Sequence, residues 1–248
     1  MNYIVYSSLF VTVFLSGLSV FLIKKNKKNT IKLLTSFSGA YLLALTFLHL
    51  IPEIYINNDS SIGLYILIGF FLQILLELFS EGVEHGHSHI ADHDHGKNHF
   101  PLAMMISLCI HSLVEGMPLA FGFENHAGEK SHFAEGSPLL LGIILHKIPV
   151  SIVLMTTFLQ AGISKKRAIT LLAILALMSP LGVIISYLVG EQLVSNISLY
   201  FDKTLAIVIG IFLHISTTIL FESSENHRFN IYKFITIILG AIIAFLTL

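Results

Sequence analysis

The run LAMMISLCIHSLVEGMPLAFGF, Leu102–Phe123, is apolar enough to cross a membrane, yet it carries His111 and Glu115 near its middle. A membrane-spanning α-helix needs about 20 predominantly apolar residues, and this run has that length. A second apolar run, Leu139–Gln160, contains His146. Ionisable side chains inside membrane helices are costly, and they mark functional sites by default. The two runs therefore predict a membrane protein with a polar site between two of its helices.

The whole chain has the composition of a multi-pass membrane protein. Its 248 residues are 54% hydrophobic and only 12% charged, and the mean hydropathy is +0.82. Soluble domains usually carry about 25% charged residues. The net charge of −1 argues against a nucleic-acid partner. The single cysteine, Cys109, excludes a disulfide framework and a cysteine-based zinc motif.

Hydropathy predicts eight membrane spans in one transmembrane domain, residues 1–248. Helices are expected because backbone groups in lipid must be paired within their own segment. We interpret the first span as a retained helix, because a basic n-region and a cleavage site for a signal peptide are missing. The predicted spans are Ile4–Ile23, Leu33–Ile54, Ile62–Phe79, Leu102–Phe123, Leu139–Gln160, Ala168–Val189, Leu205–Phe221 and Ile231–Leu248.

Lysine and arginine predict the orientation, because cytoplasmic loops of membrane proteins are enriched in them. With both termini outside, the outer loops hold only Lys130 and Lys203, and Lys147 lies inside a span. The inner loops then hold Lys24, Lys25, Lys27, Lys28, Lys32, Lys97, Lys165, Lys166, Arg167, Arg228 and Lys233. We therefore expect both termini outside the cytoplasm, in the cell membrane (plasma or inner).

A histidine-rich loop at residues 81–100 lies on the predicted cytoplasmic side. Imidazoles at this density bind Zn²⁺ or similar ions loosely, which favours metal buffering or sensing. The alternative is a polar linker with incidental histidines. A second polar loop, Glu124–Glu135, either attracts cations on the outer side or is simply solvated. The loop histidines are His85, His87, His89, His93, His95 and His99.

Two similar segments hint at an internal repeat. The second span ends with FLHLIPE, Phe47–Glu53, and the seventh contains FLHISTTILFE, Phe212–Glu222. The two FLH tripeptides and the two terminal glutamates cannot both be aligned without a gap. If the repeat is real, spans one to three and six to eight form an inverted repeat around spans four and five, an arrangement common in transporters.

Three ionisable residues in spans four and five form the candidate site. His111 and Glu115 are four residues apart and share one helix face, and His146 lies on the next span. Each costs on the order of 3 kcal/mol inside a membrane. Two imidazoles and a carboxylate suit Zn²⁺, Fe²⁺ or Mn²⁺. The alternative is a structural polar cluster that joins two helices. Pro118 and Pro149 follow these residues and can kink their helices.

Further polar residues lie toward the predicted ends of a path through the membrane. His49 and Glu53 are predicted at the outer side, His214 within span seven, and Glu222 at the inner side. These side chains either pass an ion toward and away from the middle of the membrane or are interfacial groups that reach water.

These features together resemble the ZIP (Zrt/Irt-like) family of metal transporters. The resemblance covers most of the chain: eight spans, outside termini, the His-rich loop, HLIPE at His49–Glu53, HSLVEG in span four and HKIP in span five. It implies import of divalent metal, mainly zinc, iron or manganese, into the cytoplasm. By position, His111, Glu115 and His146 match the family's metal ligands, and Ser112 matches a position often held by asparagine.

Span five departs from the family pattern. Many members have H-E-x-P-H-E where this chain has HKIPVS, residues 146–151. The resemblance implies that a carboxylate at the position of Lys147 helps to hold a second metal. A protonated lysine has no lone pair, so we expect Lys147 to repel a second cation and to pair with Glu115. Ser112, Lys147 and Ser151 are therefore expected around the metal rather than on it.

Other classes fit less well. An intramembrane metal-dependent hydrolase is the alternative function, but the H-E-x-x-H pattern of zincins is absent from the sequence. A His-rich metal exporter would not explain the motifs of spans four and five. A purely structural membrane protein would not explain why several ionisable residues, each costly to bury in a membrane, are clustered. We expect no enzyme activity and no cofactor, with Zn²⁺ (or Fe²⁺ or Mn²⁺) as transported substrate. The expected partners are divalent metal ions and lipid, with a homodimer as an alternative to a monomer.

Overall fold

The computed structural model describes residues 3–22, 28–55, 60–80, 102–120, 133–193, 196–222 and 231–247, and within these ranges it contains helices and no strands. The expected all-α class is confirmed. The elements are α1 Tyr3–Leu18, η1 Ser19–Phe21, α2 Lys28–Leu45, η2 Thr46–Leu50, α3 Ile51–Ile54, α4 Ile62–Ser80, α5 Leu102–Gly116, η4 Met117–Ala120, α6 Phe133–Gln160, α7 Lys165–Leu193, α8 Ile197–Glu222 and α9 Ile231–Leu246.

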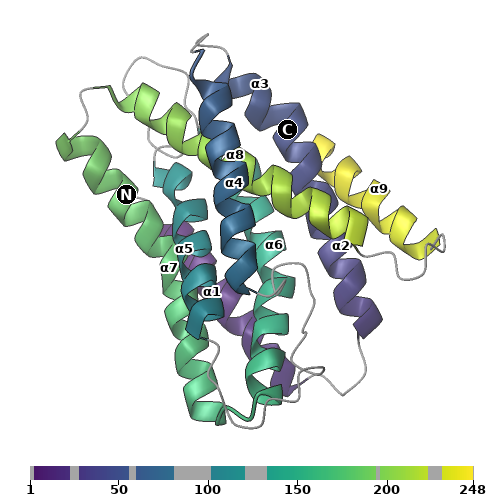
Figure 1. Ribbon diagram of the computed structural model, residues 1–248. Coiled ribbons are helices and arrows are strands. Elements are labelled where there is room, and N and C mark those ends of the chain that lie inside the picture. Colours follow the sequence, from purple (N-terminus) through teal and green to yellow (C-terminus); the bar gives the residue numbers. More distant parts are fainter. Residues whose placement is uncertain are drawn as a thin grey trace.

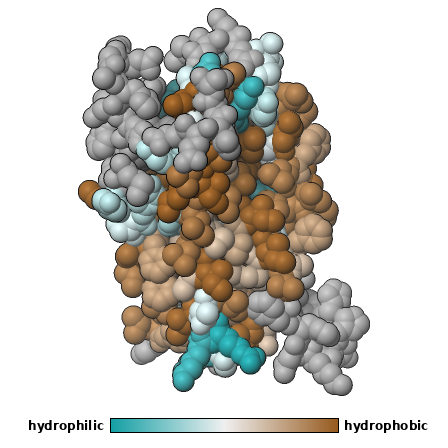
Figure 2. Space-filling view, turned by 90° about the vertical axis from the view of Figure 1, so that its left-hand side faces the viewer, coloured by the Kyte–Doolittle hydropathy of each residue, from teal (hydrophilic) through white to brown (hydrophobic). Residues whose placement is uncertain are grey.

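The helices are those of a multi-pass membrane protein. Among the described residues, seven helical segments are long and apolar enough to cross a membrane, and α9 is a shorter apolar helix of 16 residues. The predicted spans coincide with these eight segments. A broad band of hydrophobic residues lies between more hydrophilic ends (Figure 2). This band is the surface that a bilayer would cover.

The largest difference between a predicted and an observed boundary is at the start of the seventh span. The seventh span was expected to begin at Leu205, but α8 begins at Ile197. Asp202 and Lys203 lower the local hydropathy, yet both lie within the helix. Asp202 is only 7% exposed, and the Lys203 ammonium lies 5.2 Å from the centre of the Tyr65 ring. These two charges are accommodated by packing, which hydropathy does not detect.

The long helices form one bundle, with α7 and α9 at opposite edges of the view in Figure 1. The closest pairings are α4 with α8, α2 with α9, α5 with α7, and α1 with both α6 and α7. Under the expected inverted repeat, α4–α8 would correspond to α9–α2, and α5–α7 would correspond to α6–α1. The pairings agree with that correspondence, but the repeat itself stays a prediction.

Reciprocal glycines bring α5 and α7 into backbone contact. A Cβ at Gly116 of α5 would collide with the carbonyl oxygen of Ser179, and a Cβ at Gly182 of α7 would collide with that of Leu113. Small residues let membrane helices approach closely, and close packing is a main source of their association. The α5–α7 contact therefore fixes the backbone that carries His111.

A matching contact joins α4 and α8. A Cβ at Gly69 would collide with the carbonyl oxygen of Ile207, and a Cβ at Gly210 would collide with that of Ile66. These two helices therefore also meet backbone to backbone.

Apolar side chains fill the space between α5, α6 and α7 near the start of α5. Met104 and Leu108 of α5 pack with Leu154 and Phe158 of α6, and each of the four is at most 2% exposed. This packing lies between the candidate site and the ends of α5 and α6 that face the predicted cytoplasmic loops.

Candidate metal centre

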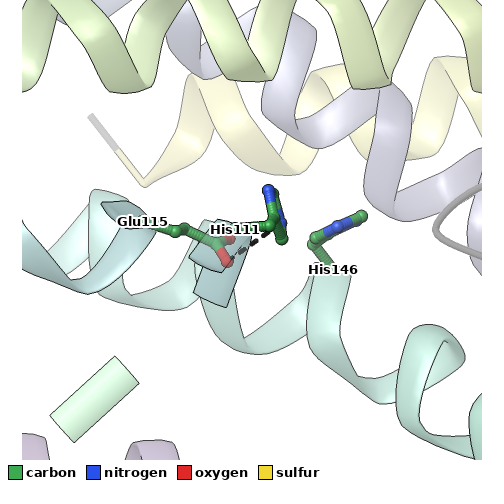
Figure 3. Close-up of side chains that lie close together, drawn as sticks. All are labelled: His111, Glu115 and His146. Carbon is green, nitrogen blue, oxygen red and sulfur yellow. Dashed lines mark ion pairs between the residues drawn. The ribbon is translucent and has the colours of Figure 1, made fainter. Parts of the chain in front are cut away.

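The three residues predicted for the site come together at the α5–α6 contact. His111 and Glu115 lie one turn apart on α5, and His146 approaches them from α6 (Figure 3). One candidate ligand atom from each lies within 4.8 Å of the others. All three residues are buried, with His111 2%, Glu115 0% and His146 1% exposed as whole residues. The sequence therefore predicted both the members of this cluster and their proximity.

The geometry of the cluster fits a small divalent cation. His111 Nε2 lies 3.4 Å from Glu115 Oε2. The rings of His111 and His146 are 6.1 Å apart between centres, with planes at 79°. Two imidazoles and one carboxylate form a frequent three-residue set for Zn²⁺ that leaves further positions open, and they also suit Fe²⁺ or Mn²⁺.

Lys147 is joined to the same carboxylate. Its Nζ lies 2.7 Å from Glu115 Oε2 and donates to Ser112 Oγ at 3.0 Å. The pairing of Lys147 with Glu115 that we expected from the sequence is present. The Lys147 side chain is only 7% exposed, so this ion pair is largely removed from water. A buried pair of this kind is held together because separating it would leave an uncompensated charge.

The two serines expected near the site differ in what they contact. Ser112 accepts a hydrogen bond from Lys147 through its hydroxyl, and its carbonyl accepts one from Ser179 Oγ of α7 at 2.9 Å. Ser151 lies 2.5 Å from Ser16 Oγ of α1 and donates to the carbonyl of Ile148 at 3.0 Å. Ser112 thus holds the lysine, whereas Ser151 ties α6 to α1.

A small cavity of about 10 Å³ lies beside the cluster. That volume is near the lower limit for a single water molecule. The cavity can hold at most about one water molecule and not a hydrated ion. Its lining is Val13, Leu108, His111, Ser112, His146, Lys147, Val150, Ser151 and Leu175.

The two prolines act differently. Pro118 lies in η4, where α5 gives way to a 3₁₀ turn after Gly116. Pro149 lies inside α6, which continues through it. Proline has no N–H, so it cannot bond the carbonyl one turn earlier, which here belongs to Leu145, the residue before His146.

His49 and Glu53, the pair predicted at the outer side (the outer pair), also lie close together, but they are farther apart and more exposed than His111 and Glu115. His49 Nε2 lies 3.9 Å from Glu53 Oε2, and the two side chains are 23% and 18% exposed. His49 lies in η2, a five-residue π-helix, and such segments are frequent at functional sites.

His214 is paired with a residue that the sequence analysis did not single out. Its Nδ1 lies 3.4 Å from Glu77 Oε2 of α4, and its ring meets that of Phe70 edge to face at 5.1 Å. Glu77 lies one turn before the end of α4. The expected path residue Glu222 ends α8, and its side chain lies outside what the structure describes.

Gln73 of α4 was also missed. It is 0% exposed, and its Oε1 lies 3.0 Å from His111 Nδ1. The available signal was a single amide inside an otherwise apolar span, but the sequence alone did not indicate which residue of which helix it would meet.

The six loop histidines, His85 to His99, lie outside the described residues. The same holds for most of the outer loop Glu124–Glu135. Their expected metal binding stays a prediction.

Comparison with known families identifies the family of this chain. The sequence matches the family described as ZIP zinc transporter over residues 2–104 and 81–247, which together cover nearly the whole chain. No curated protein matches it closely. The resemblance drawn from the motifs of spans two, four and five is confirmed, and the chain belongs to the ZIP family of metal transporters.

Proposed function

We propose that this protein moves a divalent metal ion into the cytoplasm through a site formed by His111, Glu115 and His146. Family membership makes it a divalent metal transporter and not an enzyme. We propose zinc as the main substrate, with iron and manganese as alternatives. The observation that carries the proposal is the burial of three ligand-type side chains, within 4.8 Å of one another, between two membrane helices.

The cost of burial supports the assignment. Each ionisable residue inside a bilayer costs on the order of 3 kcal/mol, so the cluster must be offset by partners. Lys147 offsets the charge of Glu115 when no metal is present. A bound cation would replace that partner and would use the imidazoles of His111 and His146 as well. Such an exchange allows the site to bind and release an ion without leaving the carboxylate unpaired.

The order of polar residues along the helices suggests the route. His49 and Glu53 lie at the end of the second span, which the distribution of lysine and arginine assigns to the outer side. Glu77 and His214 form a pair near the C-terminal end of α4, which precedes the predicted cytoplasmic loop. We propose that an ion passes these pairs before and after the central cluster. The same charge distribution supports both termini outside, in the cell membrane.

Lys147 supports a single-ion site. Its ammonium lies 2.7 Å from Glu115 Oε2, and even when a first cation takes over the carboxylate, the nearby positive charge opposes a second cation. The small adjoining cavity also has no room for another hydrated ion. We propose one metal per transport site.

Uptake into proteoliposomes tests the function. Purified protein is reconstituted with a fluorescent metal chelator trapped inside, and Zn²⁺, Fe²⁺, Mn²⁺, Co²⁺, Mg²⁺ and Ca²⁺ are added in turn. We expect saturable Zn²⁺ uptake that is lost in the Glu115→Gln variant, which keeps the shape of the side chain but not its charge. Protein-free vesicles and Glu115→Gln vesicles of equal protein content are the controls. Equal uptake by wild type and Glu115→Gln would overturn the assignment of the site, and no uptake of any ion would overturn transport itself.

A further inference from the structure

Gln73 is a buried amide in the middle of an apolar helix. Helix α4 consists mostly of leucine, isoleucine and phenylalanine, and Gln73 is 0% exposed within it. An amide moved from water to an apolar environment without a hydrogen-bond partner costs roughly 2–7 kcal/mol. The Gln73 side chain meets His111 at 3.0 Å, so this cost is offset at the candidate metal centre.

The contact with Gln73 assigns a hydrogen to Nδ1 of His111. The Gln73 atom is Oε1, a carbonyl oxygen that only accepts hydrogen bonds. His111 Nδ1 must therefore donate, and it carries the hydrogen. In a neutral imidazole the other nitrogen, Nε2, then holds the lone pair. Nε2 is the atom that faces Glu115, at 3.4 Å from Oε2.

This arrangement is the one that a metal-binding histidine needs. Histidine ligands usually donate their second ring N–H to a carbonyl or carboxylate, which fixes the ring orientation and raises the basicity of the ligand nitrogen. Loss of such a partner typically costs 10–100-fold in metal affinity or activity. Gln73 supplies this partner from α4, a helix that contributes no member of the three-residue cluster.

We propose that Gln73 is a positioning residue, which holds the Nδ1–H of His111 and so presents Nε2 to the transported metal. The inference rests on the proposed metal site and adds a fourth residue, on a third helix, to its machinery. Gln73 would not touch the ion, and its effect would pass entirely through the imidazole of His111.

A nearby hydrogen bond supplies a matched control. Ser107 lies one turn before His111 on α5, and its Oγ donates to the carbonyl of Leu76 of α4 at 2.5 Å. Ser107 is 2% exposed. Ser107→Ala thus removes a buried hydrogen bond between the same two helices without touching the His111 ring. A merely structural role for Gln73 would make the Ser107 and Gln73 variants behave alike.

The first test locates the proton in metal-free protein. ¹⁵N-histidine is incorporated into a variant that lacks Gly86–His99, and the His111 signals are identified by their loss in His111→Gln. At pH 8 we expect a protonated Nδ1 and a bare Nε2 in the wild-type site and in Ser107→Ala. In Gln73→Leu the proton should redistribute to Nε2, whereas Gln73→Glu, which keeps an acceptor oxygen, should retain it on Nδ1. A bare Nδ1 in the wild-type site, or an unchanged proton position in Gln73→Leu, would overturn the proposal.

The second test measures Co²⁺ affinity from the visible absorption of the bound ion. Gln73→Leu should bind Co²⁺ about 10–100-fold more weakly than the parent. Ser107→Ala and Gln73→Glu should stay within a few-fold of the parent, with all variants matched for melting temperature in detergent. Equal affinity of Gln73→Leu and the parent, while His111→Gln abolishes binding, would overturn the role of Gln73 alone. Binding that survives in His111→Gln and Glu115→Gln would instead overturn the metal site.

Discussion

Two histidine–glutamate pairs in this protein have the same spacing but different surroundings. His111 and Glu115 on α5, like His49 and Glu53 at the end of the second span, are four residues apart. The α5 pair is 3% and 0% exposed at 3.4 Å, whereas the outer pair is 23% and 18% exposed at 3.9 Å. Two unit charges 4 Å apart interact by about 1 kcal/mol in water and about 4 kcal/mol at an effective dielectric constant of 20. A cation is therefore attracted more strongly to the buried α5 pair than to the more exposed outer pair.

The second difference lies in the neighbouring helix. Helix α6 adds His146 to the α5 pair and completes the cluster of three. Within the part of the chain that the structure describes, no other group of three His, Cys, Asp or Glu residues meets the same distance limit. The comparison teaches that an i,i+4 His–Glu motif becomes a candidate metal centre only where a second helix supplies another ligand in a dry environment.

The largest expected effect comes from removing the carboxylate of the buried pair. Glu115→Ala should lower Zn²⁺ uptake by at least about 100-fold, because a direct ligand should matter more than the outer partners whose loss costs 10–100-fold. The measurement is initial uptake into proteoliposomes, with folding checked by size-exclusion chromatography in detergent and incorporation checked by co-flotation of the protein with the vesicles. Wild-type uptake in this variant would remove Glu115 from the mechanism and would make the two pairs equivalent.

The next effect is on the number of ions at the buried pair. Lys147→Glu replaces the ammonium beside Glu115 with a carboxylate, so the bound metal should rise from about one ion per chain to two. Metal content is measured by mass spectrometry in protein lacking Gly86–His99, so that the loop histidines do not contribute. Lys147→Met is the matched control, because it removes the charge without adding a ligand. Two full-occupancy metals around His111 and His146 in the wild type, seen by anomalous scattering, would rule this out.

A smaller effect is expected at the outer pair. Glu53→Gln removes a partly exposed charge, and interactions between such pairs are worth about 0–1 kcal/mol. The KM for Zn²⁺ should therefore rise by no more than about 5-fold, with kcat unchanged and with the effect reduced at high salt. Full uptake curves at two ionic strengths provide the measurement. A loss as large as that of Glu115→Ala would show that the outer pair is part of an obligatory site.

The smallest effect on basal transport is expected from the loop. Deletion of Gly86–His99 should leave initial uptake within about 2-fold of wild type, because the loop lies outside the predicted spans and its histidines are expected to bind ions only loosely. The response of uptake to metal preloaded on the cytoplasmic side should change. A variant with the loop histidines replaced by serine separates the effect of imidazoles from that of loop length. Complete loss of transport with normal expression would place the loop in the pathway.

The sequence was sufficient to predict the helices and the central cluster, because both depend on local patterns. Apolar runs predict spans, and the i,i+4 spacing of His111 and Glu115 places them on one face. His146 and Lys147 could be placed beside that face because they stand on the next apolar span, but the pairings made by α4 could not be predicted in this way. Gln73 meets His111, which lies 38 residues away, and Glu77 meets His214 across the α4–α8 contact. Hydropathy gives the identity of spans but not their rotation or relative height, so these partners appear only in three dimensions.

The boundary of α8 was misjudged for a related reason. Asp202 and Lys203 were treated as loop residues because their hydropathy is low. In the structure one is buried and the other lies over the ring of Tyr65. A charged residue can lie within a membrane helix where a neighbouring helix packs against it. The sequence alone does not show that packing.

The reciprocal glycines of α5 and α7 have a consequence for how the ion is released. A slide of one helix along the other by one turn, about 5.4 Å, would replace Gly116 or Gly182 with a residue that has a side chain, and a Cβ at either position collides with the facing carbonyl. Close packing at these glycines therefore favours movement of α5 and α7 as one body. His111 and Glu115 belong to that body, whereas His146 rides on α6. A tilt of α6 against that body would separate His146 from His111 and Glu115, and would therefore weaken the hold on any ion that all three side chains bind.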